Sequence, residues 1–366
     1  MRLPLKRLLI YCCMGVLISS GCSTPVESGG EAEAGMTDEQ IVELTDRVIQ
    51  WQLDTYPEEK WGKSWRDATL FIGITGIAKI LNQDSYWEIA RKWAGRQDWE
   101  IGSNRQHADD QAVGQVYLQF YEREGDDYMI RDFKRWIDVM IAKQITGAEL
   151  WNWCDALFMS PPALAHLASL TGQEKYVEFL NEKFWESKEF LYDPEHHLFF
   201  RDHRFFGESD ARGNPVFWSR GNGWVVAGLA RIMSHLPREN LHYKRYRSLF
   251  MEMMDKLAAI QPEDGLWRTN LLSPGLYPTP DVSGTSLISY ALGWGINEKI
   301  LTDDKYVVAF RKSWSGLVQK VGPDGKLGYA QKPGDRPGTV DKDNSEIFAA
   351  GAFLLAAGEA LRAEEN

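Results

Sequence analysis

The sequence predicts an all-α fold, an (α/α)6 barrel of six helical hairpins. Two observations carry this prediction. From residue 37 onward, segments with one charged and one apolar face alternate with segments that are apolar almost all round. The last hairpin is also among the most apolar, whereas an open stack of hairpins would need a polar capping repeat at its end. The chain is therefore expected to close into a ring.

The amphipathic segments are expected to form the outer helices. In the third one, Met129, Phe133, Trp136 and Ile137 recur at helical spacing, and charged residues take the opposite face. This is the pattern of a helix on the surface of a protein. The six outer segments span residues 39–56, 85–97, 127–141, 174–191, 242–260 and 303–321.

The apolar segments, rich in Gly and Ala, are expected to form the inner helices. They span residues 67–81, 110–124, 155–172, 221–236, 284–296 and 345–360. In a closed ring the inner helices begin at one end, so the loops before them meet there. A single Asp or Ser in such a loop is typical of a helix N-cap. Six loops that also carry Trp and Arg indicate a binding cleft, and residues 191–216 are expected to fold over it as a short hairpin.

The N-terminal residues predict export. Residues 1–21 resemble the signal peptide of a bacterial lipoprotein, because a basic start precedes an apolar stretch too short to span a bilayer, which ends in Ser-Ser-Gly before Cys22. Cleavage there would leave Cys22 lipidated, and ordinary secretion is the alternative. Residues 22–36 predict a flexible tether, and residues 37–366 a single catalytic domain. The protein is then expected in the cell envelope, in the periplasm or on the cell surface, held to the membrane only by its lipid.

Composition argues against several classes of function. The net charge of −11 disfavours a nucleic-acid partner. The seven histidines lack the spacing of metal ligands, and the sequence contains no phosphate loop, dinucleotide fingerprint or GxSxG motif, so neither a metal nor another cofactor is expected. Carboxylates, Arg, His and 15 Trp remain, a set that suits acid–base chemistry on a sugar.

Six runs of sequence resemble a family of glycoside hydrolases. They are HADDQAVGQ (107–115), WNWCDALFM (151–159), RDHRFF (201–206), FWSRGNGW (217–224), DVSGTS (281–286) and SEIFAAGAFLLA (345–356). In this order they are similar to family 105, the unsaturated rhamnogalacturonyl hydrolases, a family related to the unsaturated glucuronyl hydrolases of family 88. The resemblance extends over residues 40–360, and the fold it implies is the same (α/α)6 barrel.

The resemblance also implies a reaction. Polysaccharide lyases leave a C4=C5 double bond on the uronic acid at the non-reducing end of their products. In this family a carboxylic acid protonates C4, water adds at C5, and the resulting hemiketal collapses and releases the next sugar. The acid maps onto Asp155, whose pKa is expected to be raised by burial and by a second carboxylate. That second carboxylate is Asp109 or Asp110, with a slight preference for Asp110 because it heads the expected helix.

Other residues of these runs are expected to bind the oligosaccharide substrate. Arg220 is the candidate for the uronate carboxylate or a neighbouring hydroxyl, because a guanidinium binds a carboxylate with two hydrogen bonds. Trp218 and Trp224 are candidates for stacking on a sugar, with packing inside the barrel as the alternative. Cys154 is expected to be inert and to point away from Asp155. The remaining candidates for substrate contacts are His107, Trp153, His203 and Arg204.

Two alternatives stay open. The leaving sugar is expected to be that of a rhamnogalacturonan. The alternatives are a sulfated rhamnose, as in ulvan, and the sugar of another glucuronate-containing oligosaccharide. A sulfated sugar would need further cations, for which Arg201, Arg204, Arg212 and Lys332 are available at positions that the sequence does not show. A different class, a surface lipoprotein that binds glycans without catalysis, would need the aromatic residues but not Asp155. The presence of both carboxylate motifs favours the enzyme.

Overall fold

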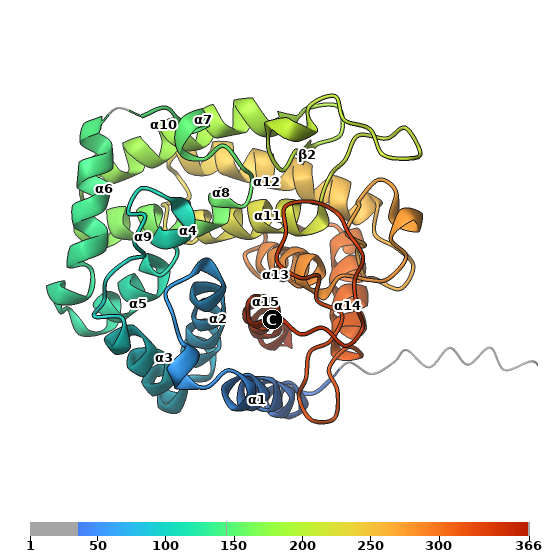
Figure 1. Ribbon diagram of the computed structural model, residues 1–366, viewed down its shortest axis with the longest axis horizontal. Helices are drawn as coiled ribbons and strands as arrows, with labels where there is room; N and C mark the ends of the chain where they lie inside the picture. Colours follow the sequence, from blue (N-terminus) through green and yellow to red (C-terminus); the bar gives the residue numbers. More distant parts are fainter. Residues whose placement is uncertain (1–35, 144, 365–366) are drawn as a thin grey trace, which may run out of the picture. The chain divides into compact units, whose positions relative to one another are not determined.

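Outer and inner helices alternate along the chain and form two layers around a common axis (Figure 1). The computed structural model describes residues 36–143 and 145–364. Within these residues the outer helices are α1 (Asp38–Thr55), α3 (Asp84–Arg96), α6 (Arg131–Lys143), α10 (Glu174–Leu191), α12 (Leu241–Ala259) and α14 (Asp304–Val318). The inner helices are α2 (Trp65–Leu81), α5 (Gly114–Glu124), α9 (Pro161–Thr171), α11 (Ser219–Met233), α13 (Val282–Asn297) and α15 (Ile347–Glu364). This is the predicted (α/α)6 barrel.

The ring closes through its last helix. α15 packs against α2 of the first hairpin and α13 of the fifth, and it also contacts α1. The approach to α2 requires glycine, because a Cβ on Gly73 would lie 2.3 Å from the carbonyl oxygen of Gly351 in α15. From Phe348 to Leu361 the side chains of α15 are buried without interruption, as a helix that is apolar all round predicts.

The outer helices bury one face. In α6, Phe133, Ile137 and Met140 are buried, whereas Arg131 and Arg135 on the opposite face are exposed. The apolar stripe of an amphipathic helix is removed from water only when it packs against the inner layer, and this burial holds the outer helix in place. The structure therefore confirms the assignment of α6 to the outer layer.

Two inner helices are interrupted, although the sequence predicted continuous ones. The short helix α4 (Ala108–Gln111) precedes α5, and α8 (Ala156–Met159) precedes α9. The second break has a clear cause, because Pro161 has no N–H to donate to the preceding turn and its ring crowds a carbonyl there. Both predicted carboxylate motifs consequently lie on short helices at the rim.

Residues 191–216 include the predicted hairpin. β1 (Tyr192–Asp193) pairs antiparallel with β2 (Leu198–Phe199), with Tyr192 opposite Phe199. Asn222 of α11 fixes this hairpin, because its side chain accepts a hydrogen bond from the N–H of Phe199 at 2.8 Å and donates one to its carbonyl at 3.0 Å. The chain that follows Phe199 therefore starts from a fixed point at the rim.

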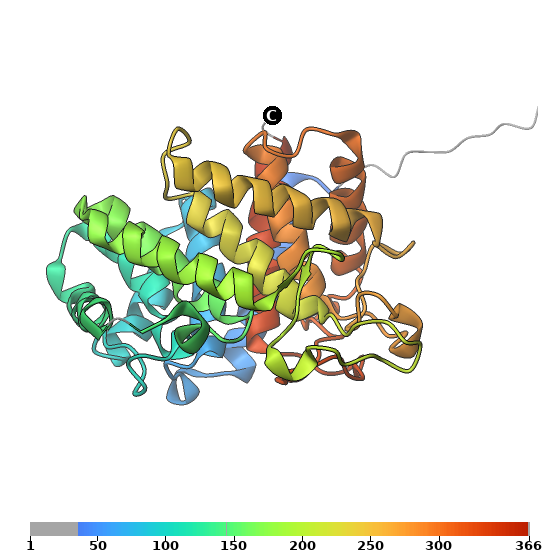
Figure 2. The same ribbon diagram turned by 90° about the horizontal axis from the view of Figure 1, so that it is seen from above.

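The remaining short elements lie in the loops. They are α7 (Gly147–Leu150) and the single-turn helices η1 (Glu58–Lys60), η2 (Asp127–Met129), η3 (His203–Phe205) and η4 (Pro274–Leu276). Figure 2 shows the loops that precede the inner helices gathered at one end of the barrel. In the described part of the chain no helix is long and apolar enough to cross a bilayer. The predicted signal peptide, Cys22 and the tether as far as residue 35 lie outside the described residues.

Candidate active site

A cavity of about 500 Å³ opens at the rim, beside the loops that precede α4 and α8. The segment that follows β2 forms one side of this cavity with Arg201. A larger hollow of about 780 Å³ runs along the exposed face of α6, away from all the predicted site residues. The lining of the rim cavity consists of Asn104, Gln106, His107, Asp109, Ile145, Glu149, Leu150, Asn152, Trp153 and Arg201.

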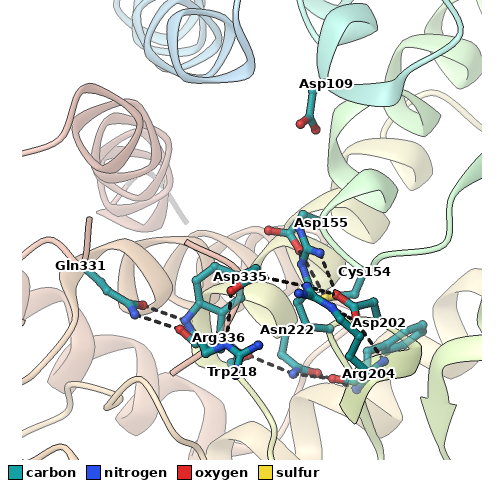
Figure 3. A network of polar contacts seen from close by, with 12 residues as sticks. Asp109, Cys154, Asp155, Asp202, Arg204, Trp218, Asn222, Gln331, Asp335 and Arg336 are labelled. Atoms are coloured by element: carbon teal, nitrogen blue, oxygen red, sulfur yellow. Dashed lines mark hydrogen bonds and ion pairs between the residues drawn. The ribbon is translucent and has the colours of Figure 1, made fainter. Parts of the chain in front are cut away.

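Asp109 supplies a carboxyl group to this cavity. Its side chain lines the wall and points toward the network that contains Asp155 (Figure 3). Burial, together with the negative charge of Asp155, raises the pKa of Asp109 to about 7, although the charge of Arg201 opposes the rise. This carboxyl is therefore protonated in about half of the molecules near neutral pH.

The neighbouring Asp110, slightly preferred from the sequence, does not line the cavity. Its carboxylate accepts a hydrogen bond from the N–H of Asn104 at 3.2 Å and fills the space beside Gly102, where a Cβ would lie 1.7 Å from Oδ1. The helix also begins earlier than predicted, with His107 as its N-cap. Asp110 thus braces the loop before α4, and Asp109 is the one of the two that lines the cavity.

Asp155 lies at the start of α8 and is almost completely buried. Its side chain makes no capping hydrogen bond to α8, so helix capping does not account for it. The Nε atom of Arg201 lies 3.4 Å from Oδ2 of Asp155. The thiol of Cys154 donates to the same oxygen across 3.6 Å, which corrects the expectation that Cys154 points away. Burial, reinforced by the charge of Asp155, raises the pKa of Cys154, so the thiol keeps its proton.

Charged side chains of alternating sign connect Asp155 to the surface (Figure 3). After Arg201 comes Asp202, which accepts hydrogen bonds from Arg201 Nη1 at 2.7 Å and from Arg204 Nη2 at 2.8 Å. Arg204 in turn donates to Asp335 at 2.7 Å. Burial alone would raise the pKa of Asp202, but the hydrogen bonds from both arginines lower it well below its usual range. The chain of charges fixes where the Arg201 guanidinium lies.

Backbone contacts position the same loop. The N–H of Cys154 donates to the carbonyl of Arg201 at 2.9 Å, and Trp153 and Asp202 form an antiparallel bridge. The loop that carries Arg201 is thereby joined to the segment that carries Asp155. The sequence shows Arg201 in the run RDHRFF and among the cations of unknown position, but not among the predicted site residues. The signal that could have found it is its place at the head of that run, within the segment predicted to fold over the rim.

His107 and Trp153, both predicted, lie together in the cavity wall. Their rings stack with centroids 4.6 Å apart. The Nδ1 atom of His107 accepts a hydrogen bond from the N–H of Asp109 at 3.3 Å. Burial, opposed by the charge of Asp110, lowers the pKa of His107, so the ring is neutral near pH 7. Both residues stay candidates for substrate contacts.

Arg220 and Trp218 lie beneath the rim. Arg220 is 1% exposed and donates hydrogen bonds to Ser283 Oγ at 3.1 Å, to the carbonyl of Gln331 at 2.8 Å and to that of Lys332 at 3.0 Å. Trp218, also 1% exposed, lies 4.3 Å from the Arg220 guanidinium and donates from Nε1 to Gln331 Oε1 at 2.7 Å. These contacts hold the loop before α15 in place. Both side chains are thus buried among contacts within the protein, and their roles toward a substrate stay predictions.

The other predicted contacts lie outside the cavity wall. Trp224 is 1% exposed and packs against Phe158, with ring centroids 4.7 Å apart, and its role toward a sugar stays a prediction. His203 and Arg204 are exposed, and neither lines the cavity. Within the described residues, no group of three or more His, Cys, Asp or Glu side chains is placed to hold a metal ion.

Comparison with known proteins shows the family. The model of Glycosyl Hydrolase Family 88 matches residues 34–364. The chain belongs to this family. It is therefore a glycoside hydrolase, and the non-catalytic glycan-binding protein is excluded. The sequence runs indicated family 105 with family 88 as its relative, and the model that matches is that of family 88.

Curated relatives of this family 88 enzyme include two named unsaturated 3S-rhamnoglycuronyl hydrolase. The one from Alteromonas sp. (strain LOR) is 35% identical over 87% of this chain and 85% of its own length. The one from Formosa agariphila is 32% identical over 91% of this chain and 94% of its own length. A solved structure of a glycosyl hydrolase family 88 protein from Bacteroides vulgatus is 28% identical, with a TM-score of 0.85 over 89% of this chain and 99% of that one.

The rim of this family 88 enzyme thus combines two carboxyl groups of different character. Asp109 holds a proton near neutral pH, whereas Asp155 lies against a positive charge. A pair with such different surroundings can donate a proton and accept another without a metal ion. The stacked His107 and Trp153 offer an apolar wall beside the pair.

Proposed function

We propose that this family 88 enzyme removes a C4=C5-unsaturated uronic acid from the non-reducing end of lyase-generated oligosaccharides, and that it does so by hydrating the double bond. The observation that carries the proposal is the carboxyl of Asp109 in the wall of the rim cavity, with a pKa that burial and the charge of the nearby Asp155 raise to about 7. The names of the two curated relatives support the same activity.

The two carboxyl groups supply the proton as a unit. Burial and the charge of Asp155 keep a proton on Asp109 in part of the molecules near neutral pH. That proton is transferred to C4, and the carboxylate left behind accepts a proton from the water that adds at C5. The hemiketal formed at C5 then opens and releases the next sugar. The resemblance makes Asp155 the group that protonates C4, and in this proposal Asp109 supplies the proton to Asp155.

For the leaving sugar, the alternative raised by the sequence is the better supported one. We propose a rhamnose that carries a sulfate, because both relatives above 30% identity are named for a 3S-rhamnoglycuronyl substrate. Rhamnogalacturonan products, the first expectation from the sequence, are then poorer substrates. Specificity of this kind is a difference in kcat/KM between two leaving groups in the same site.

The test is a panel of lyase digests of ulvan, rhamnogalacturonan and chondroitin, followed by the ultraviolet absorbance of the C4=C5 double bond. We expect absorbance to be lost fastest with the ulvan products, and saturated counterparts of the same oligosaccharides to be inert. Consumption of none of the three digests would refute the activity. Faster consumption of the rhamnogalacturonan products would refute the sulfated leaving sugar alone.

We also propose that the enzyme is exported and anchored through a lipid on Cys22. The support is the sequence pattern, in which a basic start and an apolar stretch end in Ser-Ser-Gly-Cys. The test is metabolic labelling with a fatty acid in an expression host that processes lipoproteins. Label is expected on the wild type and absent from Cys22→Ala, and equal label on both proteins would rule out this anchor.

A further inference from the structure

The two carboxyl groups of the site come from separate segments of the chain. Asp109 lies on α4, just before α5, and Asp155 directly precedes α8. The helices α4 and α8 pack against each other (Figure 1). Because the charge of Asp155 acts on Asp109, the position of α8 relative to α4 and α5 decides how the two groups interact.

The end of α8 has backbone carbonyls that its own helix does not satisfy, and the cause is in the sequence. Residues 161 and 162 are both proline, so Pro162 has no N–H for the carbonyl of Phe158, four residues earlier. The N–H of Ala163, which could reach Met159, donates to the carbonyl of Ser160 at 3.0 Å. These buried carbonyls therefore need donors from another segment.

Gln115 of α5 supplies both donors. Its side chain is buried, and its Nε2 atom donates to the carbonyl of Phe158 at 2.7 Å and to that of Met159 at 3.1 Å. Its Oε1 atom accepts a hydrogen bond from Nε of Arg231 in α11 at 2.7 Å. Both ends of the amide are thus bonded, and the guanidinium of Arg231 fixes which end faces α8.

Gln111, four residues before Gln115, makes a second link. It is fully buried, and its Oε1 atom accepts a hydrogen bond from Ser160 Oγ at 2.6 Å. Its Nε2 atom donates to the carbonyl of Arg105 at 2.9 Å, in the loop before α4. The two glutamines together make three hydrogen bonds from α4 and α5 to residues 158–160 at the end of α8.

We infer that Gln111 and Gln115 are positioning residues that set the separation between Asp109 and Asp155. The inference rests on the proposed function. Neither glutamine lines the rim cavity, so both act through the backbone that carries the carboxyl groups. Gln111 lies two residues after Asp109, and the bonded groups begin three residues after Asp155. A shift at these links therefore moves the carboxyls, and a misplacement of about 1 Å can cost roughly 100-fold in rate.

The main variant is Gln115→Met, which keeps the length of the side chain and removes the N–H donors. On an unsaturated uronyl disaccharide, kcat is expected to fall roughly 10- to 100-fold, and KM to change by less than about threefold because Gln115 does not line the cavity. The pKa of Asp109, measured without substrate from carboxyl ¹³C shifts, is expected to fall, since α8 moves away with the charge of Asp155.

Ser160→Ala breaks the other link with a smaller change. The hydroxyl of Ser160 donates to Gln111 and makes no capping hydrogen bond to α9, so its loss leaves the start of that helix unaffected. This variant is expected to lower both kcat and the pKa of Asp109, by less than Gln115→Met does. It decides the question alone if Gln115→Met does not fold.

Gln119→Met is the matched control, because it makes the same substitution four residues further along α5. The side chain of Gln119 donates to the carbonyl of Gln115 at 3.2 Å, within its own helix. Gln119→Met is expected to keep the kcat of the wild type and its pKa of Asp109. An equal loss of kcat in Gln119→Met and Gln115→Met would overturn the inference.

A purely structural role gives a different result. If the folded variants Gln115→Met and Ser160→Ala have lower melting temperatures but keep the kcat and the pKa of Asp109 of the wild type, the glutamines only stabilise the fold and the inference is wrong.

The pKa measurement separates this inference from the function beneath it. If the wild type consumes no unsaturated uronide, the proposed function fails. A lowered pKa of Asp109 in Gln115→Met would then still show that the glutamines set the separation of the two carboxyls, and an unchanged pKa would overturn that role as well.

Discussion

Replacing Asp109 by asparagine should stabilise the protein at alkaline pH. In the folded protein the pKa of Asp109 lies at about 7 instead of the ordinary 3.8. The folded state therefore binds this proton more tightly than the unfolded chain, and its stability falls as the pH rises from about 4 to about 7. The two pKa values correspond to a penalty of roughly 2 kcal/mol at pH 5 and roughly 4 kcal/mol at pH 8. Asparagine, which has no charge to bury, does not carry this penalty.

The assay is urea unfolding at pH 5 and pH 8, followed by tryptophan fluorescence. The gain in unfolding free energy of Asp109→Asn over the wild type should be larger at pH 8 by roughly 2 to 3 kcal/mol, the difference between the two penalties. Asp110→Asn is the control, because its carboxylate accepts the N–H of Asn104, and this variant should be neutral or destabilised at both pH values. A difference between Asp109→Asn and wild type that is the same at both pH values would refute the reasoning.

Three further outcomes follow from the structure. Asp155→Asn should lower the pKa of Asp109, because the charge of Asp155 contributes to raising it; carboxyl ¹³C shifts measured against pH check this, and an unchanged pKa would contradict it. Gly73→Ala should lower the melting temperature by several degrees, since its Cβ would meet a carbonyl of α15 at 2.3 Å; an unchanged melting temperature would mean that the two helices separate freely. Asn222→Ala should cost about 2 to 4 kcal/mol in urea unfolding, because it leaves the N–H and carbonyl of Phe199 without partners, and a cost near zero would show that the hairpin is held by other contacts.

The sequence predicts the fold well because helix position depends on a local pattern. The outer helix expected at 174–191 is observed as α10, Glu174–Leu191. Its apolar residues recur at helical spacing, and that spacing is visible without knowledge of the rest of the chain. The interruption before α9 was missed although Pro161 stands in the sequence, because proline is also favourable in the first turn of a helix and does not by itself show where one ends.

The site is predicted less completely, because side-chain direction depends on contacts between distant segments. Asp109 and Asp110 are neighbours on one short helix, and the bond from Asn104 decides which of them faces the cavity. Arg220 stands in a motif typical of substrate binding, and its Nη1 donates a hydrogen bond to the carbonyl of Gln331, far along the chain. A contact between residues so far apart in the chain cannot be predicted from the sequence around Arg220. Arg201, by contrast, reaches the cavity through the backbone pairing of its loop with the segment before α8.

The most direct test of the account is the turnover of an unsaturated uronyl disaccharide by the wild type, Asp109→Asn, Asp155→Asn and the double variant, each shown to be folded. Because the two carboxyls act as one acid–base unit, each single variant should lose about 10²- to 10⁴-fold in kcat. The double variant should lose little more than the poorer single one. Turnover near that of the wild type in either folded single variant would contradict the account.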